Sequence, residues 1–137
     1  MPLILDSSVL IPEERKGKNA YHAIFEITKA AGSQGLAISI VTVIELAHGI
    51  ARANTLQREQ MRRQFLQELI AAVPVLPITI PVALRAGQMD GQSAAGGVRI
   101  ALADLLIGAT ALEFGYSVAT ANARHFQLIP GLTIVRF

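Results

Sequence analysis

Hydrophobic and polar residues follow two different periods along the chain. Short apolar runs rich in β-branched residues alternate with longer segments in which apolar residues recur every three or four positions. The first pattern is typical of buried strands and the second of amphipathic helices. We predict strands over residues 3–6, 36–41, 75–78, 116–120 and 133–137. We predict helices over residues 19–32, 42–53, 55–73, 82–89 and 101–115, and a loop over residues 90–97.

The alternation of strands and helices indicates the fold class. Strands separated by helices pair in parallel, because each crossover must return over the sheet. Strands that are almost entirely apolar are expected where helices cover both faces of the sheet. We therefore predict an α/β fold with three α/β/α layers around a central parallel sheet of about five strands. A length of 137 residues and a hydrophobic content of 52% suit one domain spanning residues 1–137.

Composition excludes some kinds of site and favours a location. The chain has no cysteine, so disulfides and thiolate metal sites are ruled out. The longest uncharged apolar stretch, residues 69–84, is interrupted by Pro74, Pro77 and Pro81 and is shorter than the roughly 20 residues of a membrane span. The first residues lack the basic segment of a signal peptide. We expect a cytoplasmic protein with no membrane contact.

The net charge gives only a weak indication of partners. Twelve Lys and Arg residues stand against ten Asp and Glu residues, for a net charge of +2. This mild excess is compatible with an anionic partner, but there is no basic block that would bind nucleic acid by charge alone.

Four polar residues fall where the strands of a parallel sheet would end. Asp6 closes the first strand, and Glu45 is predicted in the first turn of the helix after the second. Asp104 is predicted in the first turn of the helix before the fourth strand, and Asn122 follows that strand. Open α/β sheets bind ligands beyond the carboxyl ends of their strands. We expect these four side chains to share one edge of the sheet.

Each of these residues also has a purely structural interpretation. Asp6 fits a turn, and Thr42 with Glu45 fits a capping box, in which the Glu reaches back to the first amide of the helix. Asp104 fits the dipole of a helix N-terminus, and Asn122 fits a turn. Asp104 is nevertheless flanked by apolar residues, where an unpaired carboxylate is costly to bury.

Taken together, the acids indicate a metal site. Three carboxylates at one edge repel one another, and a divalent cation removes that repulsion. Oxygen ligands without cysteine or a histidine cluster favour Mg²⁺, with Mn²⁺ as a substitute, over zinc. Nucleases use such ions to activate water and to stabilise the oxygens at a phosphodiester.

Four ordered segments resemble the motifs of a known family. They are LILDSSVLI at residues 3–11, SIVTVIELAHGI at 39–50, ADLLIGATALEFGYSVATANARHF at 103–126 and IPGL at 129–132. The chain resembles PIN domains, in particular the VapC-type toxins of bacterial and archaeal toxin–antitoxin pairs. The resemblance weakens between about residues 54 and 98 and is most specific over residues 103–132.

The resemblance implies a PIN-like fold and a Mg²⁺-dependent endoribonuclease. It implies that Asp6, Glu45 and Asp104 are the acidic metal-site residues, and that Asn122 fills a fourth polar position that is often Asp in relatives. Because Asn carries no charge, a tightly held second metal ion is in doubt. It also implies a homodimer, inhibited by a small antitoxin whose tail enters the active-site groove.

Further residues are assigned by their position near this edge. Ser8 and Thr120 fall where small polar residues line the site in the family, and Arg124 is a candidate RNA contact because it lies near Asn122. Loops of tRNA or rRNA are the expected substrates, since sequence-selective RNA proteins usually read single-stranded loops.

Several basic residues are interpreted as structural. The three histidines, His22, His48 and His125, are taken as structural or surface groups. The arginines of the 55–73 helix, Arg58, Arg62 and Arg63, are taken as a solvated helix face with Glu59 more than as a nucleic-acid patch.

Three rival functions are considered. A receiver domain needs adjacent acids after the first strand, and Asp6 has no acidic neighbour. A haloacid-dehalogenase-type phosphatase needs a second Asp two residues on, where this chain has Ser8. A PIN-like domain retained for RNA or protein binding without catalysis stays open, although the presence of all three acids argues against it.

Overall fold

Five parallel strands form the centre of the structure, in the spatial order β3-β2-β1-β4-β5. The structure is a computed structural model and describes residues 2–32 and 35–137. The strands are β1 (Leu3–Leu5), β2 (Leu36–Ser39), β3 (Val75–Leu76), β4 (Ser117–Thr120) and β5 (Ile134–Arg136). Every neighbouring pair is parallel. The predicted α/β class and parallel five-stranded sheet are confirmed.

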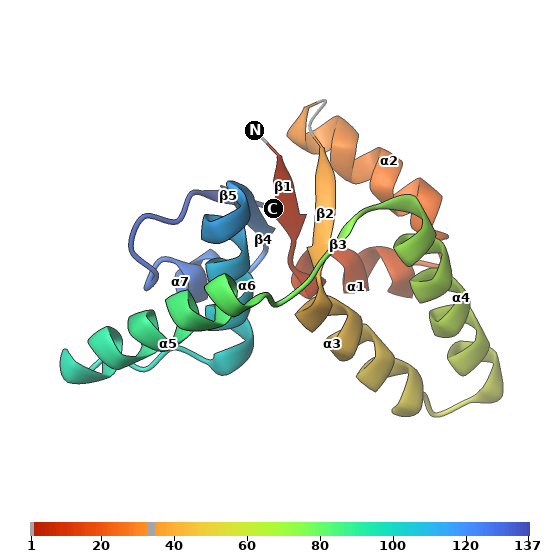
Figure 1. Ribbon diagram of the computed structural model, residues 1–137. Helices are drawn as coiled ribbons and strands as arrows, with labels where there is room; N and C mark the ends of the chain where they lie inside the picture. Colours follow the sequence, from red (N-terminus) through yellow and green to blue (C-terminus); the bar gives the residue numbers. More distant parts are fainter. Residues whose placement is uncertain (1, 33–34) are drawn as a thin grey trace.

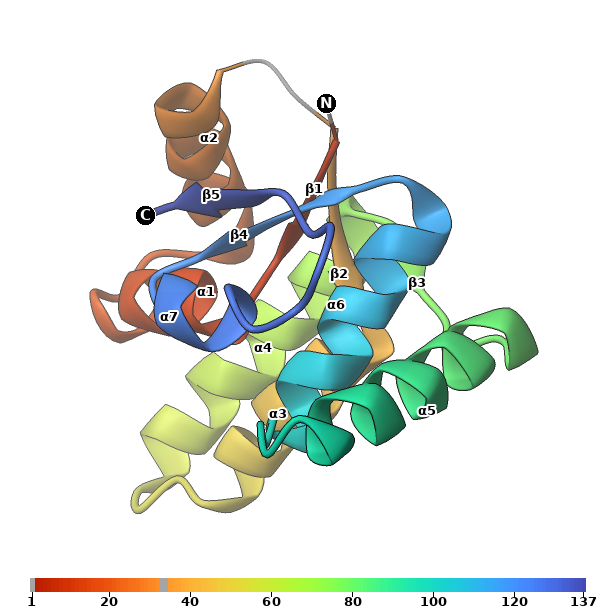
Figure 2. The ribbon, with the colours of Figure 1, turned by 90° about the vertical axis from the view of Figure 1, so that its left-hand side faces the viewer.

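Helices lie on both faces of this sheet (Figure 1). They are α1 (Ser7–Arg15), α2 (Ala20–Ala31), α3 (Ile40–Ala51), α4 (Leu56–Ala72), α5 (Ile80–Ala95), α6 (Leu102–Phe114) and α7 (Ala123–Phe126). Helices α1, α2 and α4 cover one face, α5 and α6 cover the other, and α3 continues from the carboxyl end of β2 (Figure 1). Figure 2 shows α5 running along the outside of α6, with β4 beside β1 and β5 beyond β4. The three-layer architecture is therefore confirmed.

The strand β1 explains why both faces need helices. Leu3 and Leu5 join the apolar cluster under α1, α2 and α4, whereas Ile4 joins the cluster under α5 and α6. All three side chains are fully buried. Successive side chains of a strand point to opposite faces, so an all-apolar strand requires cover on both sides. None of the helices in the described part of the chain is both long and apolar enough to cross a membrane.

Helix α1 was missed by the sequence prediction, whose first helix was placed at residues 19–32. The structure shows that the helix begins at Ser7 directly after β1, with Asp6 at its N-cap position, and that Pro12 lies inside it. Proline usually ends or kinks a helix, because it has no amide hydrogen and its ring crowds the preceding turn. Here Val9 and Leu10 are buried against the sheet, and this packing outweighs the local preference.

Helix α3 begins earlier than predicted, and the capping box at Thr42 and Glu45 is wrong. The strand before it ends at Ser39, whose hydroxyl accepts a hydrogen bond from the Val41 amide and caps the helix. Thr42 is fully buried inside the helix. Glu45 therefore lies in the second turn of α3 and has no capping role.

Helix α5 is longer than predicted, because it continues from Ile80 to Ala95 through most of the segment 90–97 that was expected to be a loop. Gly91 weakens this helix only modestly, since one interior glycine costs about 1 kcal/mol. The helix stops where Gly97 takes a positive φ of 77°. The loop at residues 121–122 is likewise followed by a helical turn, α7, that was not predicted.

Candidate functional site

The carboxyl ends of the three central strands meet at one edge of the sheet. Strands β2, β1 and β4 are neighbours and run in the same direction. Asp6 follows β1, α3 leads from the end of β2 to Glu45, and Thr120 ends β4. Asp104 lies in the first turn of α6, as predicted, and α6 contacts α3. The topology thus brings the predicted acids to the same edge.

Asp6 is held by two hydroxyl groups. Its Oδ2 accepts a hydrogen bond from Ser8 Oγ at 2.6 Å and another from Thr120 Oγ1 at 2.9 Å. The same hydroxyl oxygens accept hydrogen bonds from the amides of Ala121, at 3.0 Å, and Asn122, at 2.9 Å. Asp6 is 5% exposed and Thr120 is fully buried. Ser8 and Thr120 therefore fix one oxygen of Asp6 and the first residues after β4 in a single network.

Glu45 and Asp104 are coupled electrostatically to Asp6. Burial raises the pKa of Glu45, and the charges of Asp6 and Asp104 raise it further, while a hydrogen bond from Ser7 opposes the rise. Burial also raises the pKa of Asp104, followed by the charge of Asp6, and His125 opposes this rise. Like charges that are close in a poorly solvated site disfavour ionisation. The three acids therefore form one interacting group.

The carboxylate oxygens of Asp6, Glu45 and Asp104 are suitable ligands for a divalent cation, although they are not arranged as a preformed binding site. Glu45 Oε1 is buried and has no hydrogen-bond partner among the described residues. A buried carboxylate oxygen without a partner is costly, and a cation would satisfy it. Within residues 2–32 and 35–137, no three His, Asp or Glu side chains already have the arrangement of a metal-binding cluster. Binding of a cation would therefore have to draw the carboxylates closer together.

His125, interpreted from the sequence as a structural or surface group, is exposed and lies beside Asp104. Its Nδ1 lies 3.5 Å from Asp104 Oδ2 and pairs with this carboxylate when the imidazole is protonated. Sequence periodicity gave no signal, because α7 is a single turn of four residues. Asn122 and Arg124 are exposed on either side of Ala123, and the Asn122 side chain makes no capping hydrogen bond to α7. Both residues are therefore exposed just after the carboxyl end of β4.

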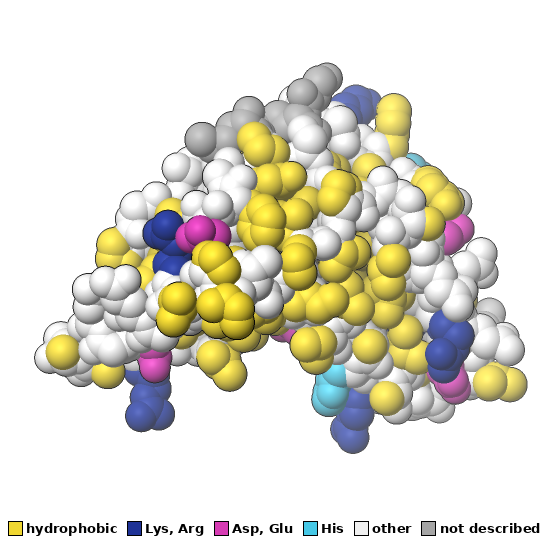
Figure 3. Space-filling view, in the orientation of Figure 1, with side chains coloured by type: hydrophobic (Ala, Val, Ile, Leu, Met, Phe, Trp, Pro, Cys, Tyr) yellow, Lys and Arg dark blue, Asp and Glu magenta, His cyan; other side chains and the backbone are white. Residues whose placement is uncertain are grey.

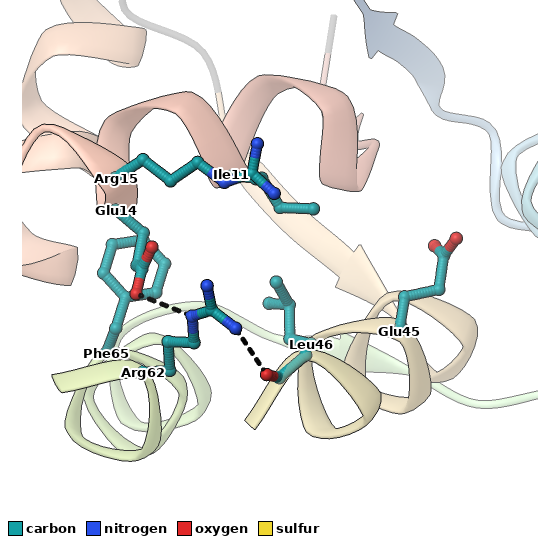
Figure 4. A pocket seen from close by; sticks show the side chains of 8 residues that line it. Ile11, Glu14, Arg15, Glu45, Leu46, Arg62 and Phe65 are labelled. Atoms are coloured by element: carbon teal, nitrogen blue, oxygen red, sulfur yellow. Dashed lines mark hydrogen bonds and ion pairs between the residues drawn. The ribbon is translucent and has the colours of Figure 1, made fainter. Parts of the chain in front are cut away.

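A small pocket of about 60 Å³ adjoins Glu45 between α1, α3 and α4 (Figure 4). It is lined by Ile11, Glu14, Arg15, Glu45, Leu46, Gly49, Arg62 and Phe65. Arg62 is fixed in it, because Nη1 donates to the Gly49 carbonyl at 2.7 Å and Nε lies 3.7 Å from Glu14 Oε1. Of the three arginines, Arg63 is the one that pairs with Glu59 among the described residues, at 3.0 Å. The predicted solvated face is therefore confirmed for Arg63 and wrong for Arg62.

Comparison with known families gives the class of this protein. The sequence profile of the PIN domain family matches residues 3–132. The match covers nearly the whole chain, including the segment in which the resemblance had appeared weak. The chain belongs to the PIN domain family.

Individual relatives are similar over almost their full length. Ribonuclease VapC1 of Rickettsia felis is 30% identical over 136 residues, which cover 98% of this chain and 96% of that protein. Ribonuclease VapC10 of Mycobacterium tuberculosis is 34% identical over 130 residues, covering 95% and 90%. The resemblance to VapC-type proteins is thereby confirmed.

Solved structures share the fold. VapBC2 from Rickettsia felis, bound to a DNA fragment from its promoter, superposes with a TM-score of 0.82 at 20% identity, covering 100% of this chain and 99% of that chain. FitAcB from Neisseria gonorrhoeae gives a TM-score of 0.75 at 26% identity, covering 98% and 96%.

The hydroxyl network around Asp6 predicts a large effect of Thr120→Val. Valine keeps the shape but removes the hydroxyl, which leaves Asp6 Oδ2 with one donor fewer and the Asn122 amide without its acceptor. We expect a loss of about 1–3 kcal/mol in the free energy of unfolding, measured by urea denaturation. Thr120→Ser keeps the hydroxyl and serves as the control. Equal stability of the Val and Ser variants would show that the network contributes nothing.

The raised pKa of Asp104 predicts that its carboxylate destabilises the metal-free fold at neutral pH. The folded chain binds the proton more tightly than the unfolded chain, so stability falls as pH rises from the ordinary value of 3.8 through the raised folded pKa. Below 3.8 both states are protonated and the penalty disappears.

We therefore expect Asp104→Asn to raise the melting temperature in EDTA at pH 7 by a few degrees, with the difference shrinking as pH falls. Asp90→Asn, which removes an exposed carboxylate from α5, should change little. A lower melting temperature for Asp104→Asn at pH 7 would contradict the expected repulsion.

Proposed function

We propose that this protein is a Mg²⁺-dependent endoribonuclease that acts as the toxin of a type II toxin–antitoxin system. The observation that carries the proposal is the electrostatic coupling of Asp6, Glu45 and Asp104 at the carboxyl edge of a PIN domain. Relatives that align over nearly the whole chain are named ribonucleases, which supports the same reaction class here.

Each residue has a distinct role in the proposed mechanism. Asp6, Glu45 and Asp104 would hold the Mg²⁺, or Mn²⁺ in its place. Such an ion, when bound, lowers the pKa of water and stabilises negative charge on phosphate oxygens. Ser8 and Thr120 keep Asp6 Oδ2 in one orientation. Glu45, whose Oε1 has no partner among the described residues, would ligate the ion through a water molecule or orient the attacking water.

The rim residues face the substrate in this proposal. Asn122 and Arg124 are exposed, so they can contact RNA without losing a structural role. His125, beside Asp104, adds positive charge near the acidic edge when it is protonated. Loops of tRNA or rRNA are the proposed substrates, because their unstacked bases and bent backbone can reach a site at a sheet edge.

The partners of the proposed toxin are a small antitoxin and a second copy of the chain. The similar structures from Rickettsia felis and Salmonella typhimurium are VapBC assemblies bound to DNA. Exposed apolar side chains support protein contacts: Ile80 and Leu84 share one face of α5, and Leu102 begins α6. Figure 3 shows apolar side chains gathered over the centre of the face that Figure 1 presents. The molar mass of the purified chain, measured by light scattering, tests the proposed homodimer. We also propose that the protein is located in the cytoplasm.

An alternative is a PIN domain that binds RNA or protein without catalysis. One observation favours it: in the described residues, the acids are not preassembled as a metal cluster.

Cleavage of a mixed tRNA and rRNA pool tests the proposed function. We expect cuts at few sites with Mg²⁺, none with EDTA, and a rate at least about 100-fold lower for Asp104→Asn. Asp90→Asn, the exposed carboxylate on α5, is the matched control and should cut normally.

Two outcomes would contradict the proposal. Cleavage that survives Asp104→Asn or EDTA would assign the activity to another site or to a contaminant. Folded wild-type protein that binds the RNA and never cuts it would favour the binding-only alternative.

A further inference from the structure

A groove leads away from the acidic edge between α1 and α4. The pocket beside Glu45 (Figure 4) adjoins a larger hollow of about 590 Å³, because Glu14, Arg15 and Arg62 line both. The larger hollow extends along α4 toward its N-terminus, where Thr55, Gln57, Arg58 and Met61 complete its lining. The larger hollow therefore lies next to the pocket that Glu45 lines.

The groove carries excess positive charge. Arg62 is neutralised by Glu14 and fixed by the Gly49 carbonyl, so it is part of the wall. Arg15 and Arg58 are exposed, and neither forms an ion pair in the part of the chain that the structure describes. In Figure 4, Arg15 extends along α1 beside Ile11, toward the Glu45 side of the pocket. Two unneutralised guanidinium groups thus follow one another along the groove.

The acidic edge needs such cations next to it if its substrate is anionic. Three carboxylates repel the phosphates that flank a scissile bond, so attraction has to come from neighbouring positive charge. Guanidinium groups suit this task, because their planar donors match phosphate oxygens and they stay charged at all physiological pH values. A hollow that adjoins the pocket of Glu45 favours the substrate strand itself over an unrelated anionic ligand.

We propose that this groove holds the single-stranded RNA that extends from the cleavage site, with Arg15 and then Arg58 contacting successive backbone phosphates. The inference rests on the proposed ribonuclease function and adds to it a path for the strand and two positioning residues. The contacts are to the backbone, so they fix the register of the RNA and carry no base preference.

RNA binding without hydrolysis tests the inference. The probe is a fluorescein-labelled mixed-sequence RNA of about 12 nucleotides, titrated by anisotropy in EDTA at salt concentrations from about 50 to 200 mM. Each phosphate contact on a single strand adds about 0.7 to the magnitude of the slope of log association constant against log salt concentration. At about 0.1 M salt this corresponds to an association constant about fivefold higher per contact.

Arg15→Gln and Arg58→Gln should each weaken binding about fivefold and reduce that slope by about 0.7, and the double variant about 25-fold. Arg63→Gln is the matched control, because it removes the same charge from α4 outside the groove. Neither groove arginine has a structural partner in the described residues, so melting temperatures should stay unchanged.

The outcomes separate this inference from the function on which it rests. If the wild type binds and cuts RNA while both groove variants match Arg63→Gln in affinity and slope, only the groove assignment is wrong. If the groove variants lose binding of a labelled oligoglutamate peptide but keep RNA binding, the groove holds an acidic protein segment instead. If the wild type neither binds this RNA nor cuts the RNA pool with Mg²⁺, both the ribonuclease function and the inference are wrong.

Discussion

The crowding of like charges at one edge of the sheet is the constraint on which the rest of the structure depends. Because β2, β1 and β4 pair in parallel, their carboxyl ends lie at the same edge of the sheet. Asp6 is nearly buried at that edge and raises the pKa of both Glu45 and Asp104. A fold selected for stability alone would replace one of these acids, because unpaired buried charge is costly. Their joint presence is therefore best explained by a ligand that needs all three.

The residues around the acids have different roles: hydroxyl groups orient Asp6, and arginines supply positive charge nearby. Hydroxyls of Ser8 and Thr120 orient Asp6 without adding charge, so the negative potential of the edge is preserved. Two arginines lie outside the group of acids, with Arg15 in α1 and Arg124 in α7. In the proposed function, these arginines would attract an anionic strand and the acids would hold the cation.

Sequence patterns predicted the features that follow from regular repetition. The all-apolar strands and the crossover helices gave the sheet, and the parallel sheet gave the position of Asp6 and Asp104. Two local features were not predicted. The packing of Val9 and Leu10 overrides the effect of Pro12 in α1, and Ser39 caps α3 in the role assigned to Thr42.

Contacts between side chains of different helices could not be predicted, for a different reason. The approach of His125 to Asp104 depends on one helical turn that is too short to leave a period in the sequence. The groove of Arg15 and Arg58 exists only after α1 and α4 are packed side by side. No spacing within a single segment contains that information.

Binding of Mg²⁺ by the intact chain is the most direct test of the central claim that the three acids form a cation site. At a Mg²⁺ concentration about tenfold above its dissociation constant, binding stabilises the fold by about 1.4 kcal/mol, or a few degrees in melting temperature. We expect this shift in the wild type and in Asp90→Asn, and its loss in Asp104→Asn and Glu45→Gln. A shift that is absent from the wild type, or equally large in all four proteins, would contradict the claim.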